Sequence, residues 1–530
     1  MIKNFIEVQL IERFRLSLIK ISRLLGKHNA TPVDFKKKKF LFNTQYIWGF
    51  SEIEFMCAAQ LKLLGHQVIV IICDGLPYSE REIVDLPKVK SYKACLNRTK
   101  RYCNAYGIEY ITINSFLNDD DKNKAKELAS KGIDSIKNFS KNNINLGDYA
   151  KRNHAHYFKG DIRPHGQFEK IYKSAFESAY LIESSFSKIL LKYSGYDMIS
   201  ANGKFIQTGI PIELHKNLGG SFYTYEHFRQ GNGVLVDKNK CSLEQNIDAV
   251  WNELKLINLT EDEKARLYHS FDLQQQSISL KEDLWDENRI DDESEIISLL
   301  ELDPTKKIIA CFPNVYWDSV HMGINAVSKD LTSWLEDMIK FANLNQEIQL
   351  IIRTHPGELK IANILQSKFT ISDSLKDRFK KIPKNVKIID PKSNISSYSL
   401  ARIADANLLW NGTMGLEIAL RGIKPVVIAD AYYANKGFTI DFLNFTELEN
   451  YLLNLDSKQL INKEERRLLE IFSFHIRFNR KFNAPYYKGR WCFTYNYLQI
   501  KPGKNKTLDR LVGFFLDKNS YMSIGSFDFE

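Results

Sequence analysis

The sequence predicts an α/β fold with more than one doubly wound unit, and three observations support this. At 530 residues the chain is too long for one hydrophobic core, so two domains are expected. Short β-branched segments alternate with helical segments in both halves, which is the rhythm of parallel βαβ units. Polar side chains and glycines follow several of these strands, where ligands bind in such folds.

The composition is that of a globular chain, with 44% apolar and 26% charged residues. The seven cysteines form no CxxC pair, which supports neither a zinc ribbon nor a disulfide framework and fits a reducing cytoplasm. No apolar run approaches the ~18 residues that span a bilayer. Glu7, Glu12 and Arg13 interrupt any secretory signal. We therefore expect a cytoplasmic location, or a peripheral one at the inner face of the membrane.

Residues 1–38 are predicted to form a basic amphipathic helix. Residues 1–40 hold ten Lys and Arg against three Asp and Glu, a net +7 of the chain's +10. One face of this helix carries apolar residues at helical spacing: Leu10, Phe14, Leu18, Ile21 and Leu25. Basic residues lie roughly opposite: Arg13, Lys20, Arg23 and Lys27. Such a helix either contacts an anionic membrane surface or packs on the protein's own body. No basic, aromatic stripe elsewhere indicates nucleic acid as a partner.

The N-terminal domain is expected over 39–300. A strand begins at residue 39, helical sequence runs over 51–64, and a β-branched strand follows at 67–73. A later strand over 221–225 ends at Glu226, which is well placed for a general base. The alternative is a surface carboxylate or a salt bridge with Arg229. The acidic, helical stretch before residue 304 is interpreted as the connection into a second domain.

The C-terminal domain is expected over 301–465, and its strands deliver polar groups in sequence. Strands over 349–352, 386–389 and 406–410 are followed by the groups expected at one sheet edge. These groups are Arg353 and His355, then Ser396 and Ser397, then Asn411, Gly412, Thr413 and Gly415. Together they offer cations, hydroxyls and backbone amides, which a nucleotide phosphate requires.

Two features of this region stay open at the level of sequence. Glu417 lies in the first turn of the helix after the glycine loop, where its carboxylate can accept hydrogen bonds from a sugar hydroxyl. The alternative is a plain βα turn with Glu417 as a helix-start residue. The loop over 436–441, which begins with Lys436, either closes over a ligand or starts the next helix.

Several of these motifs together resemble bacterial capsule polysaccharide biosynthesis proteins. The resemblance is good over about 305–445, looser over 196–230 and weak before residue 190. The motifs that carry it are Phe-Pro-Asn-Val-Tyr-Trp-Asp at 312–318, Arg-Thr-His-Pro-Gly-Glu at 353–358, Asn-Gly-Thr-Met-Gly-Leu-Glu at 411–417, Gly-Ile-Lys-Pro-Val-Val at 422–427 and Lys-Gly-Phe-Thr-Ile-Asp at 436–441.

The resemblance implies a Kdo-transferase-like glycosyltransferase of the GT-B type, with two Rossmann-like domains facing a cleft. It places the nucleotide-sugar donor on the C-terminal domain and the acceptor on the N-terminal one. By analogy, the tail over 466–530 packs back across the domains. The implied function is transfer of a sugar from a nucleotide-activated donor, a CMP-sugar such as CMP-Kdo, to a growing capsule or surface polysaccharide. The partners are then the nucleotide sugar and a glycan or glycolipid acceptor.

The resemblance also implies roles for residues. His355, Ser396 and Ser397 would contact the donor phosphate, and Glu417 would hold the ribose. The acidic base of related sialyltransferases does not align here, so Glu226 is a candidate on position alone. The expected catalytic residues are Glu226 and His355, and the expected donor-binding residues are Arg353, Ser396, Ser397, Asn411, Gly412, Thr413, Gly415, Glu417 and Lys436.

No cofactor and no metal are expected, because such enzymes need no carboxylate-bound metal ion. The acidic run over 119–121 is interpreted as a helix cap instead. Three alternatives remain. The first is a CDP-polyol phosphotransferase of the teichoic-acid type, and the second is a non-catalytic scaffold of a polysaccharide export complex. The third is a nucleotide-sugar epimerase on the same fold.

Overall fold

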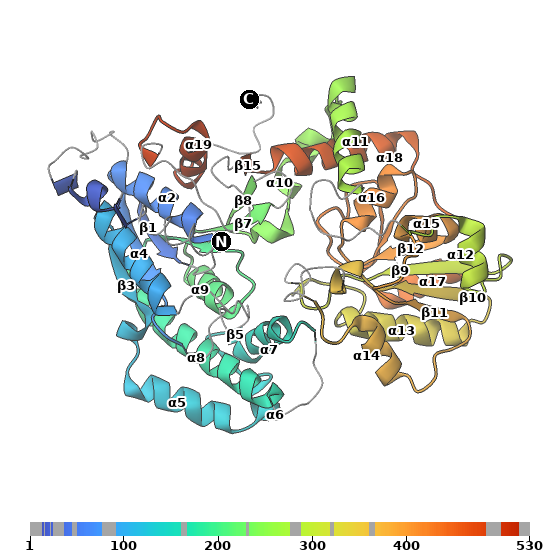
Figure 1. The fold of residues 1–530 in the computed structure, drawn as a ribbon, viewed down its shortest axis with the longest axis horizontal. Coiled ribbons are helices and arrows are strands. Elements are labelled where there is room, and N and C mark those ends of the chain that lie inside the picture. The colour runs from blue at the N-terminus through green and yellow to red at the C-terminus, as the bar shows by residue number, and fades with distance from the viewer. Residues whose placement is uncertain are drawn as a thin grey trace. The chain divides into compact units, whose positions relative to one another are not determined.

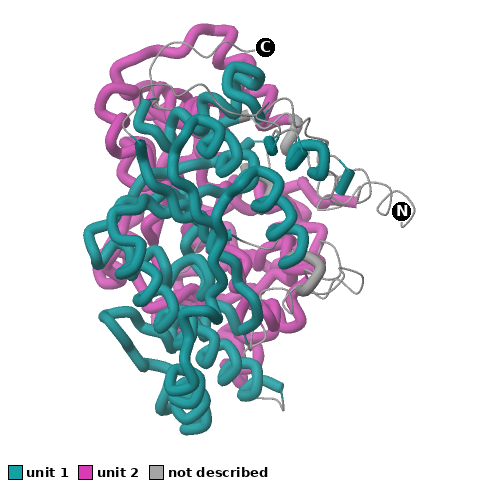
Figure 2. The backbone as a smooth tube through the Cα atoms, turned by 90° about the vertical axis from the view of Figure 1, so that its left-hand side faces the viewer, with its two compact units in different colours: residues 1–154, 163–243, 480–530 teal, residues 155–162, 244–479 magenta. Residues whose placement is uncertain are grey.

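The chain folds into two compact units, which Figure 2 shows in different colours. Unit 1 comprises residues 1–154, 163–243 and 480–530, and unit 2 comprises residues 155–162 and 244–479. The structure is a computed structural model. It describes residues 13–14, 16–21, 23–24, 37–44, 50–76, 92–160, 167–228, 233–275, 288–318, 323–359, 366–483 and 500–518.

Unit 1 is built on a seven-stranded sheet in the order β15-β8-β7-β6-β1-β2-β3. The strands are β1 (Lys39–Asn43), β2 (Gln67–Ile72), β3 (Glu109–Thr112), β6 (Asp197–Ala201), β7 (Phe222–Phe228), β8 (Gly233–Lys238) and β15 (Phe482–Asn483). The run from β3 to β7 is parallel, β8 pairs antiparallel with β7, and β15 pairs antiparallel with β8 at the edge of the sheet. Beyond their first residues β1 and β2 are buried, as expected of strands covered by helices on both faces.

The helices of unit 1 connect these strands (Figure 1). They are α2 (Phe50–Leu63), α4 (Tyr92–Tyr106), α5 (Asp119–Ser130), α6 (Ile133–Ile136), α7 (Leu146–Tyr157, of which residues 155–157 belong to unit 2), α8 (Phe168–Lys192), α9 (Ile206–Asn217) and α19 (Lys506–Phe515). The Asn118 side chain accepts from the Asp121 amide, and the Asp121 carboxylate accepts from the Asn118 amide. The acidic run therefore starts α5 as a capping box.

Unit 2 is built on a six-stranded parallel sheet in the order β11-β10-β9-β12-β13-β14. The strands are β9 (Lys307–Phe312), β10 (Ile348–Arg353), β11 (Val386–Ile389), β12 (Ala406–Leu409), β13 (Val426–Val427) and β14 (Ile440–Asp441). In each sheet the first strand is central, the next two strands are added on one side of it, and the following strands are added on the other side. This is the Rossmann order, so the predicted α/β class with two Rossmann-like units is confirmed.

Alternation along β9 explains why its sheet has a core on both faces. Ile309 and Cys311 pack with Trp334 of α13 (Leu331–Leu344) on one side. Ile308 and Ala310 pack on the other side. The remaining helices of unit 2 are α10 (Asp248–Leu254), α11 (Glu261–Gln275), α12 (Glu293–Leu299), α14 (Ile371–Arg378), α15 (Ser397–Ile403), α16 (Met414–Leu420), α17 (Phe445–Leu453) and α18 (Lys463–Phe474).

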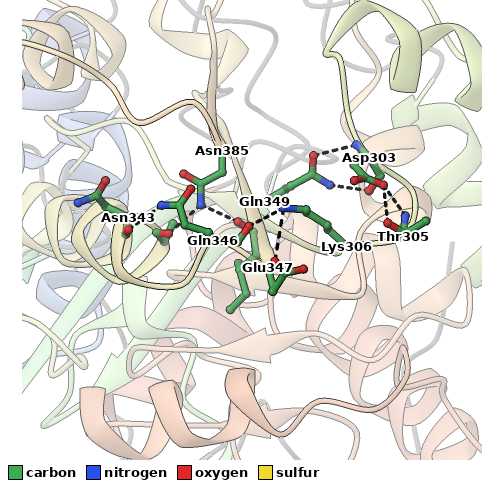
Figure 3. Close-up of polar contacts among 10 residues, drawn as sticks. Asp303, Thr305, Lys306, Asn343, Gln346, Glu347, Gln349 and Asn385 are labelled. Carbon is green, nitrogen blue, oxygen red and sulfur yellow. Dashed lines mark hydrogen bonds and ion pairs between the residues drawn. The ribbon is translucent and has the colours of Figure 1, made fainter.

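The amino edge of the unit 2 sheet is held together by its own polar groups (Figure 3). The Gln349 side chain accepts from the Asp303 amide at 2.8 Å and donates to the Asp303 carbonyl at 2.7 Å. Asn385 donates to the carbonyls of Ala342 and Ile348. Lys306 donates to the Gln346 carbonyl. These contacts join neighbouring strands and connections, so this edge is structural.

The observed division of the chain differs from the expected domain boundaries. Residues 244–300 were expected in the N-terminal domain, but they belong to unit 2. The reason is packing, because Trp251 lies edge-on against Phe472 and Ile290 forms a β-bridge with Ile395. The expected tail over 466–530 is divided at residue 480. Its aromatic stretch over 484–499 lies outside the described residues.

The described residues between 13 and 24 are helical, while the rest of the predicted helix over 1–38 lies largely outside the described residues. Leu16 and Ile19 are buried, and the Arg23 guanidinium donates to the carbonyls of Asn104 and Ala105. One face of this segment therefore packs on the protein's own body. Among the described residues, no helix is long and apolar enough to cross a membrane.

Candidate functional site

The strand order of unit 2 predicts one ligand site on its sheet. From β9 the chain moves outward to β10 and β11, and it then returns to the opposite side of β9 to form β12. The two connections leave β9 and β12 in opposite directions, which opens a crevice outside the carboxyl ends of these strands. The loops after β9, β10, β11 and β12 meet at this edge. The predicted groups at 353–355, 396–397 and 411–415 are therefore on one sheet edge, as expected.

Two asparagines bridge this switch point. The Asn314 side-chain amide, after β9, donates to the Asn411 side-chain oxygen, after β12, at 3.1 Å. The Asn314 oxygen accepts from the amide of Val315 at 2.7 Å. Both side chains are buried. Asn411 was predicted from sequence and Asn314 was not, although it lies within one of the motifs.

The loop over 411–415 is shaped by a buried tyrosine. The Tyr433 hydroxyl donates to the Gly412 carbonyl at 2.9 Å. A Cβ atom at Gly415 would lie 2.3 Å from that hydroxyl oxygen, so only glycine fits there. A Cβ at Gly412 would meet no atom within 4 Å. Gly412 thus leaves open space beside the loop backbone, which is what close approach of a ligand needs.

Glu417 is the centre of a second set of contacts. Its Oε1 accepts from the Thr413 hydroxyl at 2.8 Å, and its Oε2 accepts from the Tyr398 hydroxyl. The Arg421 guanidinium lies 4.0 Å from the centre of the Tyr398 ring and donates to the Glu417 carbonyl. Burial and the Glu417 charge raise the pKa of Tyr398, so its hydroxyl stays a donor. Both carboxylate oxygens thus accept from hydroxyl donors of neighbouring elements.

His355 is held in one tautomer when neutral. Its Nδ1 accepts from the Gly357 amide at 2.9 Å, so the ring proton is on Nε2. Burial lowers the pKa of His355 to about 4. The nearby Asp318 carboxylate raises this pKa, and the Arg353 charge lowers it. The imidazole is therefore neutral at pH 7, and its Nε2–H can donate to a ligand oxygen.

Arg353 contacts backbone carbonyls at the end of β10 and in the loop after β11. Its guanidinium is buried and donates to the carbonyls of Thr354, Asp390 and Ser393 at 3.2, 2.8 and 3.1 Å. Burial lowers its pKa to about 10. These contacts fix the loop after β11 against the end of β10. Arg353 therefore positions this edge, and direct donor binding by Arg353 stays a prediction.

The two neighbouring serines are not equivalent. Ser396 is buried and caps α15, accepting from the Ser399 amide at 3.3 Å. Ser397 is partly exposed, and its hydroxyl forms no hydrogen bond with a described residue. Of the pair, Ser397 has the hydroxyl that a ligand can use directly.

Lys436 has partners within unit 2. Its ammonium pairs with Asp248 at 2.8 Å and donates to the Ala434 carbonyl at 3.0 Å. The Asp441 carboxylate accepts from the Asn435 amide and the Thr439 hydroxyl. The stretch from Lys436 thus forms a closed turn into β14 and does not start a helix.

Unit 1 has its own switch point, between β1 and β6. There Asn43 donates to the Ser200 hydroxyl at 3.0 Å. Glu226, after β7, is partly exposed and accepts from the Asn202 amide at 3.0 Å. Arg229, the alternative partner, lies outside the described residues. No group of His, Cys, Asp and Glu in the described part of the chain is arranged to hold a metal ion.

Comparisons with known proteins find low similarity. No family model matches, and no curated protein matches. Among solved structures, a β-Kdo 2,7 transferase KpsC from Thermosulfurimonas dismutans has 13% identity and a TM-score of 0.31, covering 55% of this chain and 79% of that chain. A β-Kdo 2,4 transferase KpsC from the same organism has 15% identity and a TM-score of 0.34, covering 53% and 79%.

A UDP-N-acetylglucosamine 2-epimerase structure from Listeria monocytogenes has 9% identity and a TM-score of 0.27, covering 92% of this chain and 98% of that chain. Similarities at this level leave the function to be argued from the chain's own residues.

Proposed function

We propose that the protein is a glycosyltransferase that moves a sugar from a nucleotide-activated donor, a CMP-sugar such as CMP-Kdo, to a growing capsule or surface polysaccharide. The observation that carries the proposal is the unit 2 switch point. It combines a neutral His355 with its proton on Nε2, an available Ser397 hydroxyl and an open glycine loop at Gly412. Such groups suit the phosphate of a nucleotide sugar.

The donor groups act on the leaving nucleotide. Negative charge grows on the phosphate oxygen as its bond to the anomeric carbon breaks. The His355 Nε2–H and the Ser397 hydroxyl donate to that phosphate, and Glu417 accepts from the ribose hydroxyls. Donors that are already oriented stabilise this charge without reorganising during the reaction. No metal ion is assigned a step.

Glu226 is the proposed general base. Its carboxylate takes the proton of the acceptor hydroxyl, and the resulting oxygen bonds to the anomeric carbon as the nucleotide leaves. The side-chain amide of Asn202 orients the Glu226 carboxylate by donating a 3.0 Å hydrogen bond to it. An Asn202→Asp variant puts a like charge beside Glu226, so we expect it to lose more turnover than Asn202→Ala.

A donor panel tests the proposal. The purified chain is mixed with CMP-Kdo, CMP-sialic acid, UDP-sugars or CDP-glycerol, and released nucleotide is measured. Release from a CMP-sugar supports the proposal, and release from CDP-glycerol alone would favour the polyol phosphotransferase. Conversion of UDP-N-acetylglucosamine without nucleotide release would identify an epimerase. Failure to bind any nucleotide would favour the scaffold.

The N-terminal segment supports a membrane partner. Its side chains Phe14, Leu18, Ile21 and Leu24 are 65, 49, 52 and 68% exposed and follow helical spacing. Arg13 and Lys20 on the same segment are also exposed. We propose that this face contacts an anionic lipid surface, which exposed apolar side chains and a net charge of +7 over residues 1–40 favour.

Co-sedimentation with phosphatidylserine-containing vesicles measures this contact. Leu18→Asp is expected to lower the bound fraction. The matched control is Leu191→Asp, because Leu191 is a 71% exposed leucine outside this segment. Equal binding of both variants would remove the membrane partner from the proposal.

A further inference from the structure

A buried lysine lies beside the loop that follows β9. Lys159 is only 3% exposed, and residues 155–162 belong to unit 2 although the chain on both sides belongs to unit 1. Its ammonium lies 4.7 Å from the centre of the Trp317 ring and donates to the His156 carbonyl at 2.9 Å. It forms no ion pair with a carboxylate of the described residues.

Groups of the described residues compensate the charge of Lys159 only in part. An ammonium has three N–H donors, and one carbonyl uses one of them. Burial lowers the pKa of Lys159 to about 8, and the nearby Lys368 charge acts in the same direction. A buried cation with so few partners is costly unless an anion joins it.

The backbone at Lys159 adopts an energetically unfavourable conformation that fixes the position of the side chain. Lys159 has φ 49°, a left-handed conformation that is unfavourable for a residue with a Cβ atom. The next residue, Gly160, has φ 85°. A Cβ there would lie 3.6 Å from both the Phe369 carbonyl oxygen and the Trp317 ring. The chain thus turns closely over Trp317, which keeps the ammonium above its ring.

Trp317 connects the lysine to the turn that carries His355. The indole N–H donates to the Ser367 hydroxyl at 3.0 Å, and the Ser367 amide donates to the Glu358 carbonyl at 2.7 Å. The Glu358 amide in turn donates to the His355 carbonyl at 3.0 Å. A continuous chain of contacts therefore joins Lys159 to the carboxyl edge of the sheet.

We propose that Lys159 is a further ligand-binding residue, whose ammonium binds an anionic oxygen of the molecule held at the carboxyl edge of unit 2. The inference rests on the proposed function, because it concerns the same site. Two parts of a CMP-Kdo donor carry such oxygens, the phosphate and the sugar carboxylate. An ammonium is a compact point charge that suits either.

The experiment measures dissociation constants for three probes, CMP, free Kdo and cytidine, with the full chain. Lys159→Met keeps the length and apolar stem of the side chain and removes the charge, and Lys159→Arg keeps the charge. Lys368→Met is the control, because Lys368 is an exposed lysine close enough to act on Lys159. Melting temperatures verify that each variant is folded.

We expect Lys159→Met to weaken binding of CMP or Kdo at least about tenfold, the size of one lost charge-assisted hydrogen bond. Cytidine binding and the Lys368→Met variant should change by less than about twofold, and Lys159→Arg should recover part of the affinity. Loss confined to CMP assigns the phosphate, and loss confined to Kdo assigns the carboxylate.

A pH series adds an independent measurement. Lys159 loses its proton as pH rises from 7 to 9, so affinity for its anionic ligand should fall over that range in the wild type and not in Lys159→Met. Burial lowers the pKa of the neighbouring His156 to about 3, and burial raises that of Tyr316 to about 12, so neither titrates there. Among the described residues, the other charged group that shifts the pKa of Lys159 is Lys368, and the Lys368→Met variant controls for it.

Two results would overturn the inference, and they are distinguishable. If the wild type binds CMP, and Lys159→Met binds CMP and Kdo as tightly as the wild type does, Lys159 has no role in binding while the proposed function stands. If the wild type binds neither CMP nor Kdo, the proposed function and the role of Lys159 both fail.

Discussion

Replacing Gly415 by alanine probes how the glycine loop of unit 2 is built. The added methyl would lie 2.3 Å from the Tyr433 hydroxyl oxygen and 2.6 Å from its Cζ atom. Tyr433 is 0% exposed, so the ring cannot swing into solvent. Forcing a methyl into such a space costs about 1–3 kcal/mol. Displacing the Tyr433 hydroxyl from the Gly412 carbonyl costs about 0.5–1.5 kcal/mol more.

The expected loss of stability for Gly415→Ala is thus roughly 2–4 kcal/mol. In a domain of this size each kcal/mol shifts the melting temperature by about 2–4 °C. Differential scanning calorimetry should therefore record a drop of roughly 5–15 °C in the transition of unit 2.

Gly412→Ala is the matched control in the same loop. A Cβ at Gly412 meets no atom within 4 Å, so the melting temperature should change by less than about 2 °C. The same methyl narrows the open space beside the loop, so we expect weaker CMP binding. An unchanged melting temperature in Gly415→Ala would refute the packing described for Tyr433. Equal destabilisation by both substitutions would refute the distinction between a packed and an open glycine.

Two further predictions concern buried charged groups near His355. Glu358 is 1% exposed, its Oε2 has no hydrogen-bond partner among the described residues, and burial raises its pKa to about 8. The Glu358 carboxyl therefore keeps its proton to a higher pH in the folded state than in the unfolded state. Its contribution to the free energy of unfolding is lost as pH rises from 4.5 through 8. Glu358→Gln should raise the melting temperature at pH 8 and flatten its dependence on pH, and a lower value there would contradict this. Arg353→Met removes the hydrogen-bond donors of three carbonyls, so it should lower the melting temperature by several degrees. An unchanged melting temperature with weaker CMP binding would instead support direct donor binding by Arg353.

The positions of strand ends were predictable from sequence, because strands and their following loops follow local patterns. Runs of β-branched and apolar residues predicted the strands before His355 and Asn411, and a parallel sheet brings such ends to one edge. The pairing of Asn314 with Asn411 was not predictable, since it depends on β9 and β12 being neighbours across 97 positions in the chain.

Side-chain contacts with distant segments could not be predicted from the local sequence. Lys436 stays a predicted donor-binding residue, and its ammonium pairs with Asp248, from a segment expected in the other domain. Arg353 stays a predicted donor-binding residue, and its contacts with carbonyls of the loop after β11 were not predicted. Ser396 and Ser397 look alike in sequence, and they differ in the structure because Ser396 is buried and caps α15 while Ser397 is partly exposed. Local sequence identifies the polar groups and leaves their partners undetermined.

The most direct test of the central claim is the turnover of CMP-Kdo by His355→Asn. Asparagine keeps a side-chain oxygen that can accept from the Gly357 amide, as Nδ1 does at 2.9 Å, and it lacks the Nε2–H donor. We predict a fall of about 10²–10³ in kcat for nucleotide release, with the melting temperature nearly unchanged. Wild-type kcat in a folded His355→Asn variant would contradict the proposed role of this sheet edge in phosphate departure.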